Sequence, residues 1–376
     1  MNLKRLITDP VLLCRYLTGK AKPYRQGAIK PLGRMFKDLC WWRWTEGEFN
    51  TNYFAFGLNL AGSRQEDFIG RRSFLKIKEN VEARMRRRAG CERVCYEAVT
   101  KDKFYSCSIL SSNGIRCIPN LAVICKGEII FHDGGRDGIR ELVRLTEEFF
   151  VKNIVMESGS GVYHCRSAGE RIEVNGQMRD FSAFEELLDN GVWVLQRPIR
   201  SHEQFRRINA SALNTTRIVT IMNGNEPEYL CGFQGFATGR ALTDSWSQGS
   251  VYVGIDQERE CLKEHGITAI SDPRAGLLTE HPDSKIVFRG YSVPFLREAI
   301  ELCIKAHRLL YFNFIVGWDV AITDEGPLIV EANERPGMNV AQCLDGGLRK
   351  NIEKCAEVCL LAEDRRPDPP ERKLPS

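Results

Sequence analysis

The chain has 376 residues, of which 43% are hydrophobic and 27% are charged, and its formal net charge is +4. This composition excludes an intrinsically disordered chain, and the small net charge argues against a nucleic-acid binder, which usually carries a stronger basic bias. The length is too great for one ordinary core and predicts two or three lobes.

Residues 1–46 form a basic and aromatic start to the chain. They hold ten Lys/Arg against three Asp/Glu, and they end near the run Cys40-Trp41-Trp42-Arg43-Trp44. A segment of this kind can lie on an anionic membrane surface, which leaves a peripheral membrane contact open. Three prolines interrupt any long amphipathic helix in it. We therefore favour an irregular N-terminal lobe whose tryptophans pack inward.

The chain divides by pattern into an N-terminal region and two lobes. Residues 67–90 are helical in pattern and end at Gly90, after which a new unit starts. The Pro-rich, charged end of the chain is expected to be disordered. The expected units are an N-terminal region at 1–98, a central lobe at 99–195, a C-terminal lobe at 196–358 and a disordered tail at 363–376.

Helical and strand patterns alternate irregularly from residue 99 onward. Because there is no regular βαβ alternation, the expected fold class is α+β. The expected helices lie at 103–113, 137–148 and 292–307, the expected strands at 121–125, 129–132, 149–152, 162–166, 171–174, 192–197 and 216–222, and a β-hairpin at 313–333.

The hairpin at 313–333 carries the most informative group of polar residues. With a three-residue turn at 324–326, the strand register places Asp319 directly opposite Glu331. Side chains alternate between the two faces of a strand, so Glu331 and Asn333 share a face that Asp319 joins across the ladder. The other face is expected to be apolar, through Trp318, Val320, Ile322, Leu328, Val330 and Ala332.

This arrangement predicts a metal site. Like charges directly opposite one another destabilise a sheet, so a carboxylate pair on otherwise apolar strands requires a compensating cation. Hard oxygen ligands in a small cluster suit Mg²⁺, which takes its remaining ligands from water and substrate phosphates. The alternative is an exposed hairpin with ordinary polar residues.

The sequence around this hairpin resembles the metal-binding hairpin of the ATP-grasp superfamily. The resemblance is carried by Gly317-Trp318-Asp319-Val320 and by Glu331-Ala332-Asn333-Glu334-Arg335-Pro336-Gly337-Met338, which is similar to the corresponding end in D-alanine–D-alanine ligases. It implies two α+β lobes that clamp ATP, and it implies that Asp319, Glu331 and Asn333 bind two Mg²⁺ ions bridging the ATP phosphates.

A closer resemblance is to the sugar-transfer-associated branch of the ATP-grasp proteins. It covers about residues 100–350 and combines several short segments, each of which would be weak alone. These segments lie at 196–202, 213–220, 245–250 and 317–320.

Two lysines are expected to hold the phosphates of ATP. Lys152 ends an expected strand and precedes a Gly/Ser-rich loop that includes Ser160 and Gly161. A lysine serves as a compact point charge for phosphates, and small residues let backbone N–H groups approach them. This pattern resembles the strand lysine and closing glycine loop of the superfamily. Lys103 resembles the superfamily's first ATP lysine, with Lys101 as the alternative.

The strand that ends near residue 197 resembles the hinge between the two lobes, whose backbone binds adenine. The resemblance makes Gln196, Arg197 and Ile199 the expected adenine contacts. His202 is the expected ribose contact, although a lone histidine is also well explained by a structural role.

The expected catalytic groups are Arg217 and Lys152. Related ligases place an arginine two residues before the metal-binding aspartate, where this chain has Gly317. Arg217 is therefore the expected source of the missing positive charge, with a structural ion pair as the alternative. Two cations and a guanidinium neutralise the charge that develops in phosphoryl transfer.

The resemblance implies an ATP-dependent carboxylate–amine ligase with ATP and Mg²⁺ as cofactors. An acyl phosphate forms from a carboxylate, an amine attacks it, and ADP and phosphate are released. The expected partners are the small-molecule acid and amine and no nucleic acid. The residues expected to contact these substrates are Trp246, Gly249, Asn339 and Gln342.

Two alternatives to the ligase stay open. One is an ATP-grasp kinase that phosphorylates a hydroxyl, for which His202 or Asp244 could serve as the general base. The other is a non-catalytic ATP-binding member. The N-terminus lacks the features of a secretory signal, no stretch approaches the roughly 20 apolar residues of a membrane span, and the 14 cysteines are scattered. We therefore expect free thiols and a cytoplasmic location.

Overall fold

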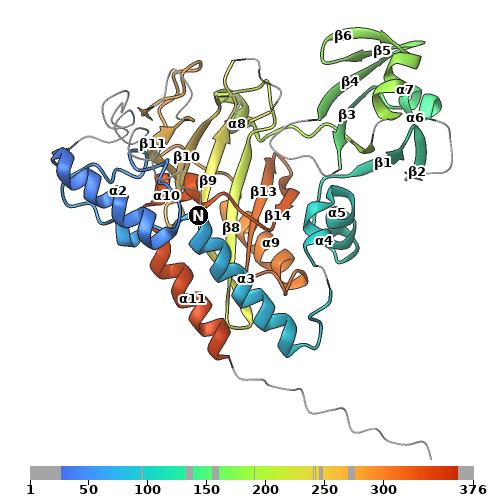
Figure 1. Ribbon diagram of the computed structural model, residues 1–376. Helices are drawn as coiled ribbons and strands as arrows, with labels where there is room; N and C mark the ends of the chain where they lie inside the picture. The colour runs from blue at the N-terminus through green and yellow to red at the C-terminus, as the bar shows by residue number, and fades with distance from the viewer. Residues whose placement is uncertain are drawn as a thin grey trace, which may run out of the picture.

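The computed structural model contains two seven-stranded sheets (Figure 1). The N-terminal sheet has the strand order β2-β1-β7-β3-β4-β5-β6, and the C-terminal sheet has the order β12-β11-β10-β9-β8-β13-β14. The expected α+β class is thereby confirmed. The structure describes residues 27–94, 96–132, 139–154, 161–189, 191–239, 241, 243–244, 249–269 and 276–362.

The N-terminal sheet buries one face against helices α6 and α7. In β3, Phe149 and Val151 are completely buried in this core, whereas Phe150 and Lys152 line a cleft on the other face. The alternation is the period of two of an extended strand, and it turns Lys152 away from the core. The elements are β1 (Asn120–Cys125), β2 (Glu128–His132), α6 (Ile139–Leu145), β3 (Glu148–Asn153), β4 (Val162–Ala168), β5 (Arg171–Val174), β6 (Gln177–Asp180), α7 (Phe181–Asp189) and β7 (Val192–Gln196).

The C-terminal sheet is covered by helices on both faces (Figure 1). Helix α9 packs on one face and helices α3, α10 and α11 on the other, so that β13 is buried at every position except Asp319. The elements are β8 (Thr215–Asn223), β9 (Glu226–Phe236), β10 (Val251–Asp256), β11 (Cys261–Ile267), β12 (Leu277–Leu278), β13 (Ile315–Thr323), β14 (Gly326–Asn333), α4 (Glu97–Lys101), α5 (Lys103–Ser112), α8 (Glu203–Ile208), α9 (Leu296–Leu309), α10 (Met338–Asp345) and α11 (Arg349–Leu361).

The N-terminal region packs directly on the C-terminal sheet. Its helices are α2 (Leu32–Glu46), η1 (Gln65–Asp67) and α3 (Arg71–Arg88), so the helix expected at 67–90 begins at residue 71. In α3, the Nζ atom of Lys78 lies 2.7 Å from Glu82 and 3.6 Å from Glu334, which directly follows β14. Glu82 also accepts the backbone N–H of Phe314 at 2.9 Å.

The tryptophans of α2 do not all pack inward. Trp42 is buried in a cluster with Tyr53 and Phe56, whereas Trp44 is 89% exposed. The expectation of inward packing is right for Trp42 and wrong for Trp44 and for Trp41, which is 38% exposed. Among the described residues, no helix is long and apolar enough to span a bilayer, and the described cysteines are free thiols.

Most elements expected between residues 99 and 223 are present with small shifts at their ends. Helix α5 begins at Lys103 because Asp102 caps it, accepting the backbone N–H groups of Phe104 and Tyr105. Helix α9 begins at Leu296, four residues later than expected. The sequence did not predict α2, α4, β6, α7, α8, β9, β10, β11, β12, α10 or α11. The expectation of an irregular N-terminal lobe is wrong for α2, because this helix begins directly after Pro31 and no proline interrupts it. The tail expected to be disordered, 363–376, lies outside the described residues.

The β13–β14 hairpin differs from its expected form in two ways that cancel. Its turn has two residues, since Thr323 pairs with Gly326, rather than the expected three. A β-bulge between Val320 and Asp319 then adds one residue on β14. The bulge restores the expected register, and Asp319 lies opposite Glu331.

Candidate active site

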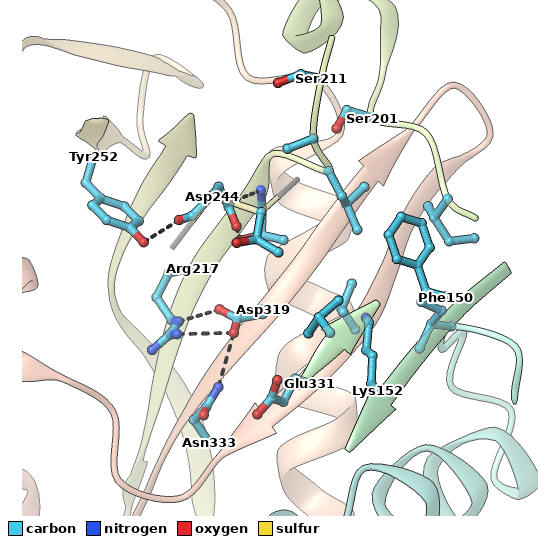
Figure 2. Close-up of a pocket in the computed structure, with 18 of the residues that line it drawn as sticks. Phe150, Lys152, Ser201, Ser211, Arg217, Asp244, Tyr252, Asp319, Glu331 and Asn333 are labelled. Atoms are coloured by element: carbon cyan, nitrogen blue, oxygen red, sulfur yellow. Dashed lines mark hydrogen bonds and ion pairs between the residues drawn. The ribbon is translucent and has the colours of Figure 1, made fainter. Parts of the chain in front are cut away.

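A cleft of about 900 Å³ lies between the two sheets. Residues of the N-terminal sheet, of α5 and of the C-terminal sheet line it, and Asn52 and Ala55 of the N-terminal region close one side. Figure 2 shows that Lys152 from β3 and Glu331 from β14 approach each other across this space. The cleft is therefore formed by parts of the chain that are far apart in sequence.

The three residues expected to bind metal lie together on the floor of the cleft. Asp319 and Glu331 are 20% and 28% exposed at their side chains, and the Nδ2 atom of Asn333 donates to Asp319 Oδ2 at 3.2 Å. Val330, which was expected on the apolar face, also lines the cleft. The bulge explains this difference, because it inserts Val330 between the residues that pair with Val320 and Asp319.

Arg217 forms a two-point ion pair with Asp319 from the neighbouring strand β8. Its Nε atom lies 2.6 Å from Oδ1 and its Nη2 atom 3.2 Å from Oδ2 (Figure 2). Burial alone lowers the pKa of a guanidinium, but Asp319 outweighs this effect and the pKa of Arg217 is raised. Arg217 thus stays charged inside the cleft.

Gly317 provides the space that Arg217 needs. A Cβ atom at Gly317 would lie 2.8 Å from the Cβ of Pro336 and 3.4 Å from the Cδ of Arg217. An arginine at position 317 would therefore collide with this neighbourhood. The guanidinium comes from β8 instead.

Two lysines surround Glu331 on its other side. Lys103 Nζ, at the start of α5, lies 3.7 Å from Glu331 Oε1. Burial raises the pKa of Glu331, while Lys103 and Lys152 oppose that rise. Burial likewise lowers the pKa of Lys152, and Glu331 opposes that change. The positive charges of these lysines and the negative charges of the carboxylates therefore partly offset each other, and the cluster can still accept further charged groups.

The donor atoms on the cleft floor fit a divalent cation. Asp319 and Glu331 are opposed in register, and Asn333 offers an amide oxygen as a third hard ligand. No group of three His, Cys, Asp or Glu side chains with metal-binding geometry occurs among the described residues, so this mixed set depends on the amide. Like-charged carboxylates on directly opposed residues favour a cation between them.

The hinge segment reaches the cleft through some of its expected residues. Arg197 and Ile199 line the cleft, together with Arg200 and Ser201. Gln196 does not line it, because its side chain is 1% exposed and donates to Asn120 Oδ1 at 2.8 Å. The side chain of Gln196 therefore cannot contact adenine, and only its backbone could do so.

His202 has a structural contact instead of the expected place in the cleft. Its Nδ1 atom accepts the backbone N–H of Gln204 and caps helix α8. Its ring also packs edge-on against Phe295. The structure therefore corrects the expectation that His202 faces the ribose or acts as a base.

Two expected contact residues lie outside the described residues. Ser160 and Trp246 belong to the segments 155–160 and 245–248. Gly161 is described, and its carbonyl accepts the N–H of Asn153 at 2.9 Å beside the cleft-lining Val162. Gly249 does not line the cleft, and its carbonyl accepts Thr238 Oγ1 at 3.2 Å.

The two residues expected after the Pro336-Gly337 turn have different surroundings. Asn339 is exposed and lines the cleft. Gln342 is completely buried, where its amide accepts from Ile69 N at 2.8 Å and donates to Ile69 O at 3.0 Å. The structure therefore corrects the expected substrate contact of Gln342, which holds α10 to the N-terminal region.

Asp244 forms a second acidic group in the cleft. Its Oδ2 atom accepts both Thr215 N at 2.6 Å and Thr215 Oγ1 at 2.7 Å, and its backbone carbonyl accepts the Tyr252 hydroxyl at 2.6 Å (Figure 2). Gly235 permits this approach, since a Cβ there would lie 2.8 Å from Asp244 Oδ2. Burial raises the pKa of Asp244 to about 6.

The surroundings of Asp244 carry little signal in the sequence. Thr215 and Tyr252 were not expected in the site, because ordinary threonines and tyrosines in strands carry no pattern of their own. A third group, Glu148 with His164 and Arg166, also lines the cleft. Glu148 Oε1 lies 2.7 Å from His164 Nε2 and 3.0 Å from Arg166 Nη2. Alternating positions on β4 are the only sequence signal for this group.

One family model and several solved structures of low identity are similar to this chain. A family model described as "Sugar-transfer associated ATP-grasp" matches residues 90–357. No curated protein matches the sequence. A D-alanine–D-alanine ligase from Coxiella burnetii is 14% identical with a TM-score of 0.40, and the match covers 70% of this chain and 58% of that protein.

Two further solved structures are similar at the same level. The D-alanine–D-alanine ligase from Bacillus anthracis complexed with ATP is 12% identical, with a TM-score of 0.39 and coverages of 71% and 67%. An ADP complex of N5-carboxyaminoimidazole ribonucleotide synthetase is 11% identical, with a TM-score of 0.38 and coverages of 64% and 46%. The match thus spans about half the length of that synthetase and of the Coxiella ligase. Likeness at this level carries no functional argument.

Proposed function

Because the chain belongs to the sugar-transfer-associated ATP-grasp family, whose model spans residues 90–357, we propose that it is an ATP-dependent carboxylate–amine ligase. One observation carries the proposal. Asp319, Glu331 and Asn333 share one cleft with Lys103, Lys152 and Arg217, although these six residues come from five different elements.

In the first step, a carboxylate oxygen of the acid attacks the γ-phosphorus of ATP, which breaks the bond to the bridging oxygen and releases ADP. Lys103 and Lys152 face Glu331 from α5 and β3 and bind the phosphates as point charges. Asp319, Glu331 and Asn333 would hold a divalent cation, which neutralises phosphate charge when it is bound. Positioning and neutralisation of this kind suffice for phosphoryl transfer.

Arg217 contributes the remaining positive charge near the reacting centre. It is half-buried and its pKa is raised, so it stays protonated. Its two-point ion pair with Asp319 fixes the orientation of the planar guanidinium. In the second step, the amine nitrogen attacks the acyl carbon and phosphate leaves. A preorganised guanidinium stabilises the negative charge on the oxygens in that step.

Asp244 is the residue best placed to take the proton that the attacking amine loses. Thr215 donates twice to its Oδ2 atom, and Asp244 lines the cleft that holds Arg217 and Asp319. A half-buried carboxylate with a pKa of about 6 is ionised at neutral pH and suits general-base catalysis. It also attracts the positive charge of a protonated amine before the reaction.

A kinase is the second candidate, and Asp244 is the observation that favours it. A kinase needs a base near the γ-phosphate to deprotonate a hydroxyl. Asp244 lines the same cleft as Asp319 and Glu331 and has a raised pKa. His202, the other base considered from the sequence, is occupied in capping α8.

The test measures ADP and free phosphate separately while pools of acids, amines and sugars are supplied with ATP and Mg²⁺. The ligase proposal requires ADP and phosphate in equal amounts, and only when an acid and an amine are both present. ADP without free phosphate identifies the kinase. Nucleotide binding without either product identifies a non-catalytic member. Glu331→Gln serves as the inactive control in each assay.

A further inference from the structure

Helix α2 has one buried face and one exposed apolar face. Its buried side chains recur at helical spacing, at Met35, Leu39 and Trp42. Exposed apolar side chains occupy the opposite side, four of them at intervals of four residues and Trp41 beside them. We call this set the outer face of α2, and it consists of Leu32 (59% exposed), Phe36 (45%), Cys40, Trp41 (38%) and Trp44 (89%).

The exposed charges of α2 are all positive. Its two acidic residues are buried, with Asp38 paired to Lys30 at 2.7 Å and Glu46 bound to Arg349 and to the N–H of Gly70. Arg34 and Lys37 are exposed; Arg34 keeps 68% of its side chain exposed although its Nε atom also lies 3.5 Å from Asp38 Oδ1. The outer face therefore combines aromatic and aliphatic side chains with basic neighbours and no exposed acid.

This combination fits a bilayer surface. Tryptophan at 89% exposure leaves a large apolar ring in water, and such rings favour the headgroup level of membranes. Basic side chains beside them are attracted by anionic phospholipids. We propose that the outer face of α2 docks on the surface of a bilayer that contains anionic phospholipids.

Charge favours a lipid surface over a second copy of the chain. Two outer faces brought together would place the like-charged Arg34 and Lys37 of one copy near those of the other. One helical stripe also offers little area, whereas a stable interface buries roughly 1,200–2,000 Å² in total. An anionic bilayer interacts favourably with both the apolar and the basic side chains.

The position of α2 links docking to the cleft. Figure 1 shows α2 at the edge of the molecule opposite the N-terminal sheet. Asn52 and Ala55, a few residues after α2, line the cleft. The chain that follows α2 therefore runs from the docking helix to the lining of the cleft. If the proposed ligase function holds, an acid or amine attached to a lipid would reach the cleft from the side that Asn52 and Ala55 line.

The experiment measures co-flotation of the full chain with vesicles of phosphatidylcholine alone and with 30% phosphatidylglycerol. The wild-type protein should bind the anionic vesicles and not the neutral ones. Trp44→Ser with Phe36→Ser should weaken binding roughly 30- to 150-fold, since roughly 2–3 kcal/mol of apolar burial is lost. Lys37→Gln should weaken it about fivefold, because each basic residue contributes about 1 kcal/mol.

A matched control removes an exposed apolar side chain elsewhere. Ile130 in β2 is 62% exposed, and Ile130→Ser should leave vesicle binding unchanged. Nucleotide binding and the unfolding midpoint should be equal in all variants, since these side chains lie outside the core. Quenching of wild-type tryptophan fluorescence by brominated lipid supplies a readout that needs no variant, and Trp44→Phe should reduce it.

Three results would overturn the proposal. The first is equal binding to neutral and anionic vesicles, or none to either. The second is undiminished binding by the Trp44/Phe36 variant, which would assign binding to another part of the chain. The third is a wild-type dimer in sedimentation that the same variant dissociates, which would assign the outer face to a second copy. Each readout is independent of ATP turnover, so it stands apart from a failure of the ligase proposal.

Discussion

Arg217 and Asp319 are direct partners across strands β8 and β13, and the guanidinium contacts both carboxylate oxygens of Asp319 at 2.6 and 3.2 Å. Asp319 is also the proposed cation ligand that lies between Arg217 and Glu331. The guanidinium and a bound cation therefore compete for the carboxylate oxygens of Asp319. Cation binding should depend on how strongly Arg217 holds Asp319.

Replacing Arg217 should separate cation affinity from turnover. In Arg217→Met, the competing charge is absent, so Mn²⁺ should bind several-fold more tightly in the presence of ADP. Turnover should nevertheless fall about 10²- to 10³-fold, as when one stabilising donor is removed from an active site. Titration of Mn²⁺ by electron paramagnetic resonance and a steady-state assay would measure the two effects. Arg217→Lys, which keeps the charge, is the control. Weaker Mn²⁺ binding in Arg217→Met would contradict the competition.

Glu331→Gln should abolish turnover with little change in stability. The variant removes one of two opposed carboxylates and so weakens the proposed cation site. Burial raises the pKa of Glu331, which means that its charged form is disfavoured in the fold, and a neutral amide relieves its repulsion with Asp319. The unfolding midpoint should stay equal or rise. Glu325→Gln, at the exposed turn of the same hairpin, is the matched control and should retain activity. Unchanged ATP consumption in Glu331→Gln would refute the metal assignment.

The hairpin shows why this part of the site could be predicted from sequence. Its contacts are local, so alternation and a short turn were enough to bring Asp319 opposite Glu331. The turn was one residue shorter than expected, and a bulge on β14 compensated. Neither feature has a strong sequence signal. The prediction was therefore correct in its result although two of its details were wrong.

Other parts required contacts that sequence patterns do not reveal. The amides of Gln196 and Gln342 bind Asn120 and Ile69, which are 76 and 273 residues away. Strand β9 was missed because Gly232 and Gly235 lie inside it, where glycine ordinarily suggests a turn. In the structure, Gly235 is required by the close approach of Asp244.

Lys78→Met should destabilise the whole fold. Lys78 is 1% exposed and lies 2.7 Å from Glu82, so its removal leaves a buried carboxylate without its main partner. Losing one member of a buried pair costs about 3–5 kcal/mol. Urea unfolding should show this loss in a single transition if α3 and the C-terminal sheet unfold together. Adding Glu82→Gln removes the unpaired charge, keeps an acceptor for Phe314 N and should recover part of the loss. Two separate transitions would show that the N-terminal region is independent.

Asp244→Asn should remove a pH dependence of the free energy of unfolding. Burial raises the pKa of Asp244 from 3.8 to about 6, so between these values the folded state binds more protons than the unfolded chain. The contribution of this group to the free energy of unfolding therefore falls as the pH rises through that window. Unfolding curves of the variant should lack this fall.

The same variant tests the role of Asp244 as a base. In the wild type, the ionised form should predominate above about pH 6, and kcat/KM for the acceptor should rise with pH through that value. In Asp244→Asn this acidic limb should disappear and the plateau should fall about 10²-fold or more, while ADP binding stays the same. Thr215→Ser, which keeps the hydroxyl and the backbone N–H, is the control. An unchanged acidic limb in the variant would assign it to another group.

Asn339 and Gln342, one helical turn apart on α10, should respond to substitution in opposite ways. Gln342→Leu leaves the buried N–H and C=O of Ile69 without partners, and each orphaned group costs about 1–3 kcal/mol. Its unfolding midpoint should fall while the KM values of the correctly folded fraction stay unchanged. Asn339 is exposed in the cleft, so Asn339→Ala should keep the midpoint and raise one acceptor KM by roughly two- to tenfold, the worth of one hydrogen bond. Thermal unfolding and steady-state kinetics on both variants distinguish the two roles. A raised KM in Gln342→Leu at normal stability would return that residue to the substrate site.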